Sequence, residues 1–339
     1  MERRAILRVV LVSMLMVACA LPVAVSAQSR SGRGGLYGDW QVKYEFRERQ
    51  MEAIIAFSRD QEGKRTAQWI SFTGLSELKD LKYEDGQLSF SRVSRGRDGE
   101  TRTSTFKGTI QDGKLSGTMS SDRGEYKVEG APSPRMSRAV GSWEMTLKRE
   151  DREFKSTLVV KADAQRKLSA LWRSERGEME IPNVQYERGT LGFKMERKTD
   201  ERQWEASFEA TIQRETDTLS GVVKSQRGEM AVEGKRIGAP LIGTWNLDTV
   251  SERGSRKSRL RVNPDMSALY GAIPVEKVEF EGDQVSFKMV LEFGDQSFEM
   301  NFAGKVEDAK LTGELTSSRF SQKVTGTKVV RRSRSRRTQ

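Results

Sequence analysis

The sequence predicts an all-β protein made of three tandem antiparallel barrels, each closed from eight up-and-down strands. A Gly-x-Trp step occurs three times, at Gly38-Asp39-Trp40, Gly141-Ser142-Trp143 and Gly243-Thr244-Trp245, so a unit of roughly 100 residues is repeated. Apolar and polar residues alternate through long stretches, which is the pattern of strands with one buried face. Turn signals such as Asp85-Gly86 interrupt these stretches about every dozen residues.

The repeat sets the expected domain boundaries. When the three copies are aligned, further positions match, for example Leu115-Ser116-Gly117, Leu219-Ser220-Gly221 and Leu311-Thr312-Gly313. We therefore expect barrels at residues 36–132, 139–237 and 240–329, preceded by a linker at 28–35. The third copy is shorter between Trp245 and Gly282, so this part of the third unit should differ from the other two.

The apolar face of each unit predicts that its strands close into a barrel. Leu191, Phe193 and Met195 alternate with polar residues, and such a face is hidden when eight strands close into a barrel that leaves no exposed edge. A weaker repeat aligns 168–181 on 219–232, which suggests units of about 51 residues and makes a six-bladed propeller the alternative.

A Gly-x-Trp step at the start of the first strand, followed by an antiparallel meander, resembles the calycin group of lipocalin-like and avidin-like barrels. The resemblance implies that Trp40, Trp143 and Trp245 are structural plugs at one end of each barrel. The units are shorter than typical lipocalins, and the shared column Arg123, Arg227 and Arg319 lies beside a turn. These arginines are therefore interpreted as turn residues and not as the arginine that stacks on the tryptophan in lipocalins.

Two further aromatic columns are candidate ligand-binding residues, because a small barrel holds either side chains or one small ligand. Core filling is the competing interpretation, and the sequence favours it. The six candidates are Trp69, Trp172, Tyr270, Phe90, Phe193 and Phe287.

The composition excludes several kinds of chemistry. The chain has no histidine, which removes Ser-His-Asp catalysis and most zinc sites, and it has no Gly-rich phosphate loop. We expect no cofactor, no metal and no catalytic residue. A glycosidase built from carboxylates is the remaining enzymatic hypothesis, with Glu187 as its best candidate, but the recurring acids are explained better as turn and surface residues.

The N-terminal segment is typical of an export signal. Residues 1–27 combine a basic start, an apolar stretch and small residues before Gln28. We expect a periplasmic or extracellular protein without a transmembrane span after cleavage. A lipid anchor on Cys19, the single cysteine, is the alternative.

The net charge of +11 is concentrated at the ends of the chain. Residues 328–339 hold six basic residues and no acid, and residues 1–27 hold a net two positive charges, which leaves +3 for the three units. A disordered tail at 330–339 is a candidate site for an envelope polyanion or glycan, whereas nucleic acid is a poor partner for an exported protein. The tail residues concerned are Arg331, Arg332, Arg334, Arg336 and Arg337.

Repetition without a catalytic constellation points to a non-catalytic binding or scaffold protein of the cell envelope. The two alternatives are a lipocalin-like carrier of a small apolar ligand and, less favoured, the carboxylate glycosidase. The sequence selects no ligand, partner or oligomeric state.

Overall fold

The computed structural model describes residues 36–46, 49–95, 100–199, 202–251, 254–275, 277–293 and 296–329. In these ranges every regular element is a strand, so the all-β prediction is confirmed. No helix in this part of the chain has the length and apolar character needed to cross a membrane. The expected signal at 1–27, its Cys19, the linker at 28–35 and the tail at 330–339 lie outside the described residues.

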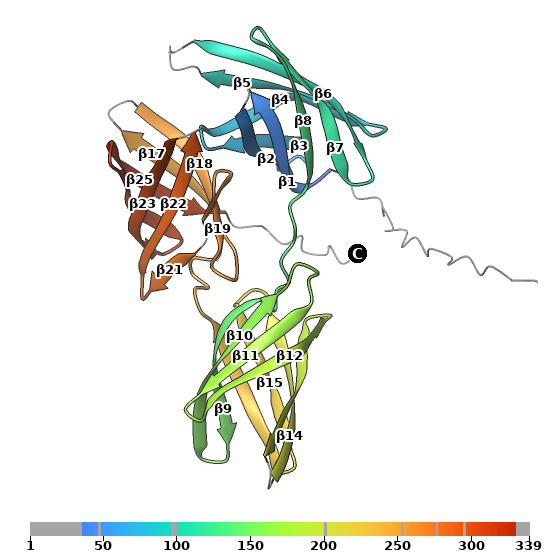
Figure 1. Ribbon diagram of the computed structural model, residues 1–339, viewed down its shortest axis with the longest axis vertical. Helices are drawn as coiled ribbons and strands as arrows, with labels where there is room; N and C mark the ends of the chain where they lie inside the picture. Colours follow the sequence, from blue (N-terminus) through green and yellow to red (C-terminus); the bar gives the residue numbers. More distant parts are fainter. Residues whose placement is uncertain are drawn as a thin grey trace, which may run out of the picture. The chain divides into compact units, whose positions relative to one another are not determined.

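Barrel 1 is a closed eight-stranded barrel in which each strand pairs with its neighbour in sequence (Figure 1). Its closing pair joins the first and last strands, with Trp40 opposite Pro132. The hairpins that join its first two and its last two strands lie at one end, which we call the hairpin end. The strands are β1 (Gly38–Phe46), β2 (Arg49–Arg59), β3 (Arg65–Ser71), β4 (Gly74–Glu84), β5 (Gln87–Arg95), β6 (Thr101–Gln111), β7 (Lys114–Ser121) and β8 (Gly124–Pro132).

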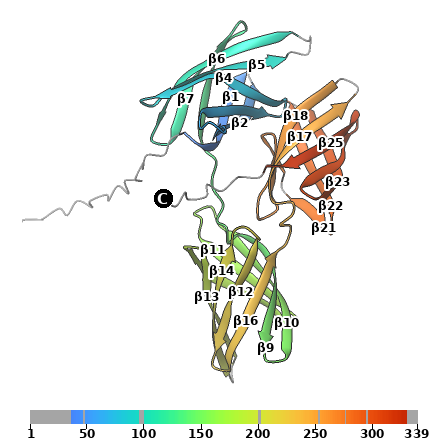
Figure 2. The ribbon, with the colours of Figure 1, turned by 180° about the vertical axis from the view of Figure 1, so that it is seen from behind.

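Barrel 2 repeats this order and is also closed. Its closing pair is formed by β16 and β9, and Figure 2 shows the wall in which these two strands lie beside β10. The strands are β9 (Gly141–Arg149), β10 (Arg152–Ala162), β11 (Leu168–Ser174), β12 (Gly177–Glu187), β13 (Thr190–Thr199), β14 (Arg202–Gln213), β15 (Thr218–Ser225) and β16 (Gly228–Arg236).

Barrel 3 departs from the predicted closed barrel of eight strands, and it does so where the sequence is shortened, which is the part expected to differ. It is a nine-stranded sheet in the order β20-β19-β18-β17-β25-β24-β23-β22-β21, and its edge strands β20 and β21 follow each other in the chain. Three short strands replace the long third and fourth strands. The strands are β17 (Gly243–Ser251), β18 (Gly254–Val262), β19 (Ala268–Tyr270), β20 (Ile273–Val275), β21 (Val278–Glu281), β22 (Gln284–Phe293), β23 (Gln296–Glu307), β24 (Lys310–Ser317) and β25 (Phe320–Lys328).

Each barrel has its own hydrophobic core, which excludes the six-bladed propeller. A stacked phenylalanine pair recurs in all three cores. Phe90 and Phe106 have ring centroids 4.8 Å apart, Phe193 and Phe208 are 4.5 Å apart, and the pair in barrel 3 is 4.8 Å apart. These pairs come from directly opposed residues on neighbouring strands, so the strand register places the rings in contact.

The recurring Leu-Ser-Gly step makes room for these rings. Gly108 and Gly117 lie opposite each other on β6 and β7. A Cβ atom at these two positions would lie 2.6 Å and 2.5 Å from Cζ of Phe106. The phenyl ring therefore covers a surface without side chains, and Phe302 lies in the same way against Gly304 and Gly313 of barrel 3. In barrel 2 a Cβ atom at Gly221 would instead meet Ala210 and backbone atoms.

The predicted turns join the expected strands. Asp85 and Gly86 both have positive φ angles, of 48° and 80°, as two-residue hairpins of the right twist require. The arginine column is also confirmed as a turn feature, because the backbone N–H groups of Arg123, Arg227 and Arg319 each donate to the serine hydroxyl two residues earlier.

One buried ion pair links barrel 1 to barrel 3. Asp39, the middle residue of the first Gly-x-Trp step, accepts hydrogen bonds at 3.0 Å from both Arg259 and Arg261 of β18. The side chains of Asp39 and Arg259 are 9 % and 7 % exposed, so water screens this pair little. Ile54 and Ile70 form a small apolar cluster with Leu269 of barrel 3.

Candidate functional site

The six aromatic ligand candidates all lie in the cores. Each is at most 8 % exposed, and Trp69 is fully buried. Phe90, Phe193 and Phe287 are each one half of a stacked phenylalanine pair. Trp172 makes edge contacts with both rings of its own pair, at 6.3 and 5.9 Å. The six side chains therefore lie where the favoured core-filling interpretation puts them, and the alternative ligand-binding role stays a prediction.

The tryptophans of the Gly-x-Trp steps are also buried, and a cation covers two of them. Trp143 donates its indole N–H to the carbonyl oxygen of Ala139 at 3.0 Å, and the Arg236 guanidinium lies 4.0 Å above its ring. In barrel 3, Trp245 donates to Leu241 at 2.7 Å, and the ammonium group of Lys328 lies 5.6 Å from its ring centroid. In barrels 2 and 3 the last strand supplies this cation, because it pairs with the strand that carries the tryptophan.

Arg236 was not identified as a functional candidate in the sequence analysis. It is 5 % exposed, forms an ion pair with Asp217 at 3.0 Å, and donates to the carbonyl oxygens of Arg138 and Val140. Burial lowers its pKa, although the contact with Asp217 opposes this effect. The feature that could have identified Arg236 is its position at the end of the last predicted strand, opposite Trp143. Barrel 1 has Pro132 at the corresponding position, so a cation there is not shared by all three units.

Lys328 was counted among the basic residues of the tail in the sequence analysis, and the structure places it in a strand instead. It ends β25, and its ammonium group donates to the carbonyl oxygens of Ala239 and Pro240 at 3.1 and 2.7 Å. Burial lowers its pKa. Lys328 is therefore part of barrel 3, while the five tail arginines lie outside the described residues and their polyanion-binding role stays a prediction.

The recurring acids lie on the outside of the barrels. Glu187 is exposed where β12 ends, and Glu84 and Glu281 are exposed at the corresponding places in barrels 1 and 3. No group of three or more metal-binding side chains occurs among residues 36–46, 49–95, 100–199, 202–251, 254–275, 277–293 and 296–329. The glycosidase hypothesis stays untested.

A trough crosses the outer face of barrel 2 and is the candidate binding site. Its volume is about 900 Å³, and it passes over β15, β16, β9, β10 and β11, which are neighbours in the wall. Four of the strands contribute three consecutive residues each, whereas β11 contributes Arg173 and Ser174 and is followed by Glu175 in the turn. The middle residue of the three points into the core, as Met145 and Leu219 do, and its backbone forms the floor. With neighbouring strands about 4.8 Å apart, the trough extends about 19 Å.

Two rows of outward side chains form the sides of the trough. The register places residues of one row opposite each other on successive strands, except that Glu175 lies in the turn that follows β11. The first row consists of Thr218, Lys235, Glu144, Thr157 and Arg173, and the second of Ser220, Glu233, Thr146, Lys155 and Glu175.

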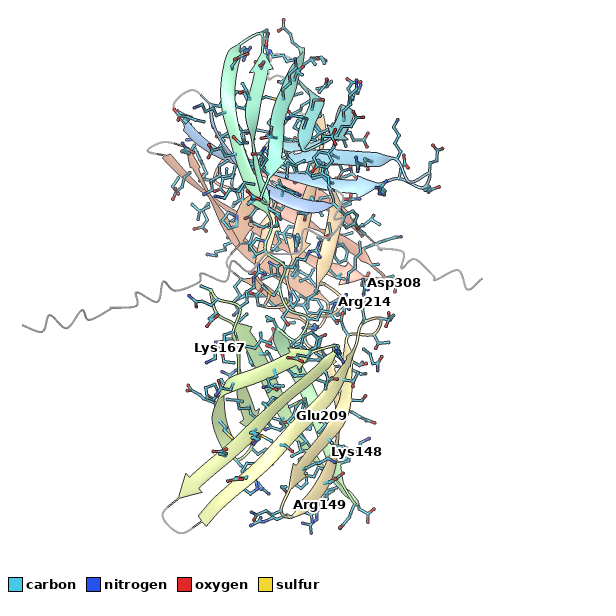
Figure 3. The ribbon with its side chains drawn as sticks, turned by 90° about the vertical axis from the view of Figure 1, so that its right-hand side faces the viewer. Lys148, Arg149, Lys167, Glu209, Arg214 and Asp308 are labelled. Atoms are coloured by element: carbon cyan, nitrogen blue, oxygen red, sulfur yellow. The ribbon has the colours of Figure 1, made fainter. Side chains whose placement is uncertain are left out.

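The charges that line the trough balance, with three basic and three acidic side chains among its hydroxyl groups. Glu233 accepts from Lys148 at 3.1 Å, and Arg173 donates to Glu178 at 2.8 Å. The hydrogen bond and charge of Glu233 raise the pKa of Lys148. Figure 3 shows Lys148 and Arg149 toward one end of barrel 2 and Arg214 toward the other.

Four charged groups of the trough remain available. In the described part of the chain, Glu144, Lys155, Glu175 and Lys235 have no ion-pair partner. Their side chains are exposed, so these donors and acceptors face solvent. An arrangement of this kind can exchange hydrogen bonds with a polar ligand.

Comparisons with known proteins do not assign a family. No family model and no curated protein matches the chain. Among solved structures, a proposed outer membrane protein of Bacteroides fragilis aligns over 59 % of this chain and 96 % of its own, with 10 % identity and a TM-score of 0.24. A protein of unknown function from the DUF3598 family of Nostoc punctiforme covers the same shares, with 11 % identity and a TM-score of 0.19.

Transferrin binding protein B of Haemophilus parasuis aligns over 88 % of this chain and 77 % of its own, with 10 % identity and a TM-score of 0.21. Likenesses at this level carry no argument about function. The calycin-like resemblance therefore rests on the closed barrels and the buried tryptophans, and no family model matches the Gly-x-Trp step.

Proposed function

We propose that this protein is an exported, non-catalytic binding protein of the cell envelope, and that the trough of barrel 2 binds an uncharged or mixed-charge glycan chain. The observation that carries the proposal is the trough itself: two rows of hydroxyl and charged side chains over five strands, with four charged groups unpaired among the described residues. Its volume of about 900 Å³ lies within the usual range of ligand sites.

The closed barrel favours a glycan over a peptide. A peptide that binds a sheet usually adds a strand at a free edge, and barrel 2 has no free edge because β16 pairs with β9. The trough rows contain no apolar side chain that a peptide side chain would cover. A chain of hydroxylated rings, in contrast, exchanges hydrogen bonds with side-chain hydroxyls, carboxylates and ammonium groups alike.

The balance of charge favours a ligand without a large net charge. Three acids and three bases line the trough, so a strongly anionic polymer gains little there. The charges also differ among the barrels: Glu144 of barrel 2 corresponds to Gln41 and Asn246, and Lys235 corresponds to Ala131 and Thr327. The repeat therefore preserves the cores but not the trough, and we assign the site to barrel 2 alone.

The proposal is tested by retention of the full chain on immobilised cell-wall glycan fragments, measured by surface plasmon resonance. The double variant Glu144→Ala/Lys155→Ala removes two unpaired exposed groups, so stability should change by no more than about 0.5 kcal/mol. We expect at least tenfold weaker retention, since a hydrogen bond to a charged group contributes about 1.5–3 kcal/mol.

The matched control is Lys194→Ala/Glu196→Ala, which removes one base and one acid from a second, smaller hollow of barrel 2. This variant should retain the glycan as the unchanged chain does. If both double variants weaken retention equally, or if the unchanged chain is not retained, the assignment of the trough is wrong.

A further inference from the structure

Barrel 1 contains a cation that the other two barrels lack. Arg92 lies on β5 and points to the same side as Leu88 and Phe90, which are in the core. It is half-buried near the hairpin end. Its Nε donates to the hydroxyl of Ser76 at 3.3 Å, and its guanidinium carbon lies 4.9 Å from the ring centroid of Trp69.

The partners of Arg92 are aromatic and hydroxyl groups. It also hydrogen-bonds to Tyr126, and no carboxylate of the described residues interacts with it. Burial lowers the pKa of Arg92, and burial raises the pKa of Tyr126 and of Tyr44, the latter to about 12. Both tyrosines are therefore neutral near pH 7, and the half-buried guanidinium has no counter-charge among the residues that the structure describes. Such a charge is unfavourable unless an anion joins it.

An unsatisfied hydrogen-bond donor lies in the same cluster. Trp69 is fully buried, and its indole N–H finds no hydrogen-bond acceptor among the described residues. Tyr44 lies 5.6 Å from the Trp69 ring and 5.3 Å from the Tyr126 ring, so aromatic side chains surround the cation.

Comparison with barrel 2 shows that this polar cluster is not required by the fold. Barrel 2 closes in the same strand order, yet the equivalent positions are all apolar and belong to or pack against its core. Barrel 3 has the buried Met289 at the position of Arg92. The side chains of barrel 1 and their counterparts in barrel 2 are Tyr44 and Leu147, Ser76 and Met179, Arg92 and Met195, and Tyr126 and Met230.

We propose that the hairpin end of barrel 1 binds an organic monocarboxylate, whose carboxylate pairs with Arg92 and whose apolar or aromatic body packs against Tyr44 and Tyr126. A planar guanidinium matches a carboxylate through two parallel hydrogen bonds. A single cation complements a single negative charge, which favours a carboxylate over a phosphate dianion. The stacked Phe90 and Phe106 occupy the barrel below Arg92, so only the head group and a short part of the body enter.

The test is calorimetric titration of the full chain with 4-phenylbutyrate, which has one carboxylate and one aromatic ring. We expect saturable binding, and we expect no binding of 4-phenylbutan-1-ol or inorganic phosphate at the same concentrations. Arg92→Met installs the residue of barrel 2 and should weaken phenylbutyrate binding at least tenfold. Arg92→Lys keeps the charge but loses the planar fork, so its affinity should fall between the two.

Thermal unfolding of Arg92→Met supplies a second measurement. Without ligand, this variant should unfold at the same temperature as the unchanged chain or above it, because an uncompensated charge is removed. A lower unfolding temperature would mean that Arg92 is needed for folding, and this overturns the proposal.

Three binding results also overturn it: no binding of phenylbutyrate, equal binding by Arg92→Met, or equally tight binding of phosphate. Glu144→Ala/Lys155→Ala, which alters only the trough, should bind phenylbutyrate unchanged. The two proposed sites therefore stand or fail independently.

Discussion

Replacing Gly221 with alanine tests whether the recurring strand glycines are required by close packing. Gly221 lies on β15 opposite Ala210 of β14. A Cβ atom at this position would lie 2.7 Å from Cβ of Ala210 and nearer still to the Glu209 carbonyl oxygen, whereas ordinary contact begins at 3.4 Å. Most of the atoms approached belong to backbone that the barrel holds in register, so no flexible side chain can turn away.

The expected loss is about 1–3 kcal/mol, the usual effect of inserting a methyl group into a fully packed site. In a unit of roughly 100 residues, this lowers the unfolding temperature of barrel 2 by about 4–8 °C for each kcal/mol. Gly192→Ala is the matched control in the same barrel. Its nearest neighbour would be the Phe208 carbonyl oxygen at 3.7 Å, and its φ angle is not positive, so alanine fits.

The control should be stabilised by about 0.4–1 kcal/mol, because alanine restricts the unfolded chain more than glycine does. Hydrogen exchange measured by mass spectrometry on the full chain assigns the change to peptides of β13–β16 and separates barrel 2 from its neighbours. If Gly221→Ala is as stable as Gly192→Ala, close packing does not explain the recurring glycine.

Two further predictions concern buried charge and pH. Arg236→Met should destabilise barrel 2 by about 3 kcal/mol in urea unfolding, because Asp217 and two carbonyl groups lose their donor. The control Arg227→Ala, which alters a turn, should change stability by less than about 0.5 kcal/mol. Similar effects of the two substitutions would contradict the role of Arg236 above Trp143. The pKa of Tyr44 is raised to about 12 by burial, while Arg92 opposes this and Tyr126 adds to it. The folded chain therefore keeps a proton that the unfolded chain loses near pH 10, so stability should fall as the pH rises from about 10 to 12. Tyr44→Phe should flatten this fall when urea midpoints are compared at each pH, and an identical fall in both proteins would refute the assignment.

Much of the fold could be predicted because its signals are local or periodic. Alternation along the chain predicted strands, and Asp85-Gly86 and the Ser-x-Arg steps are found in the expected turns. The repeat of the Gly-x-Trp step predicted three barrels over a propeller, and the short third copy predicted a different third barrel. The candidate sites were not predictable in this way, because their side chains come from strands that are far apart in the sequence.

The sequence by itself determined that this protein is a set of all-β units with aromatic cores, since strand pattern, turns and repeat length depend on neighbouring residues and on period. Only the tertiary structure decided which polar groups meet. Barrel closure and register bring Arg236 above Trp143 and Arg92 onto Trp69, and they align Thr218 with Arg173 in one row of the trough. Such contacts depend on which strands are paired and on which residues face each other, and no local pattern in the chain carries that information.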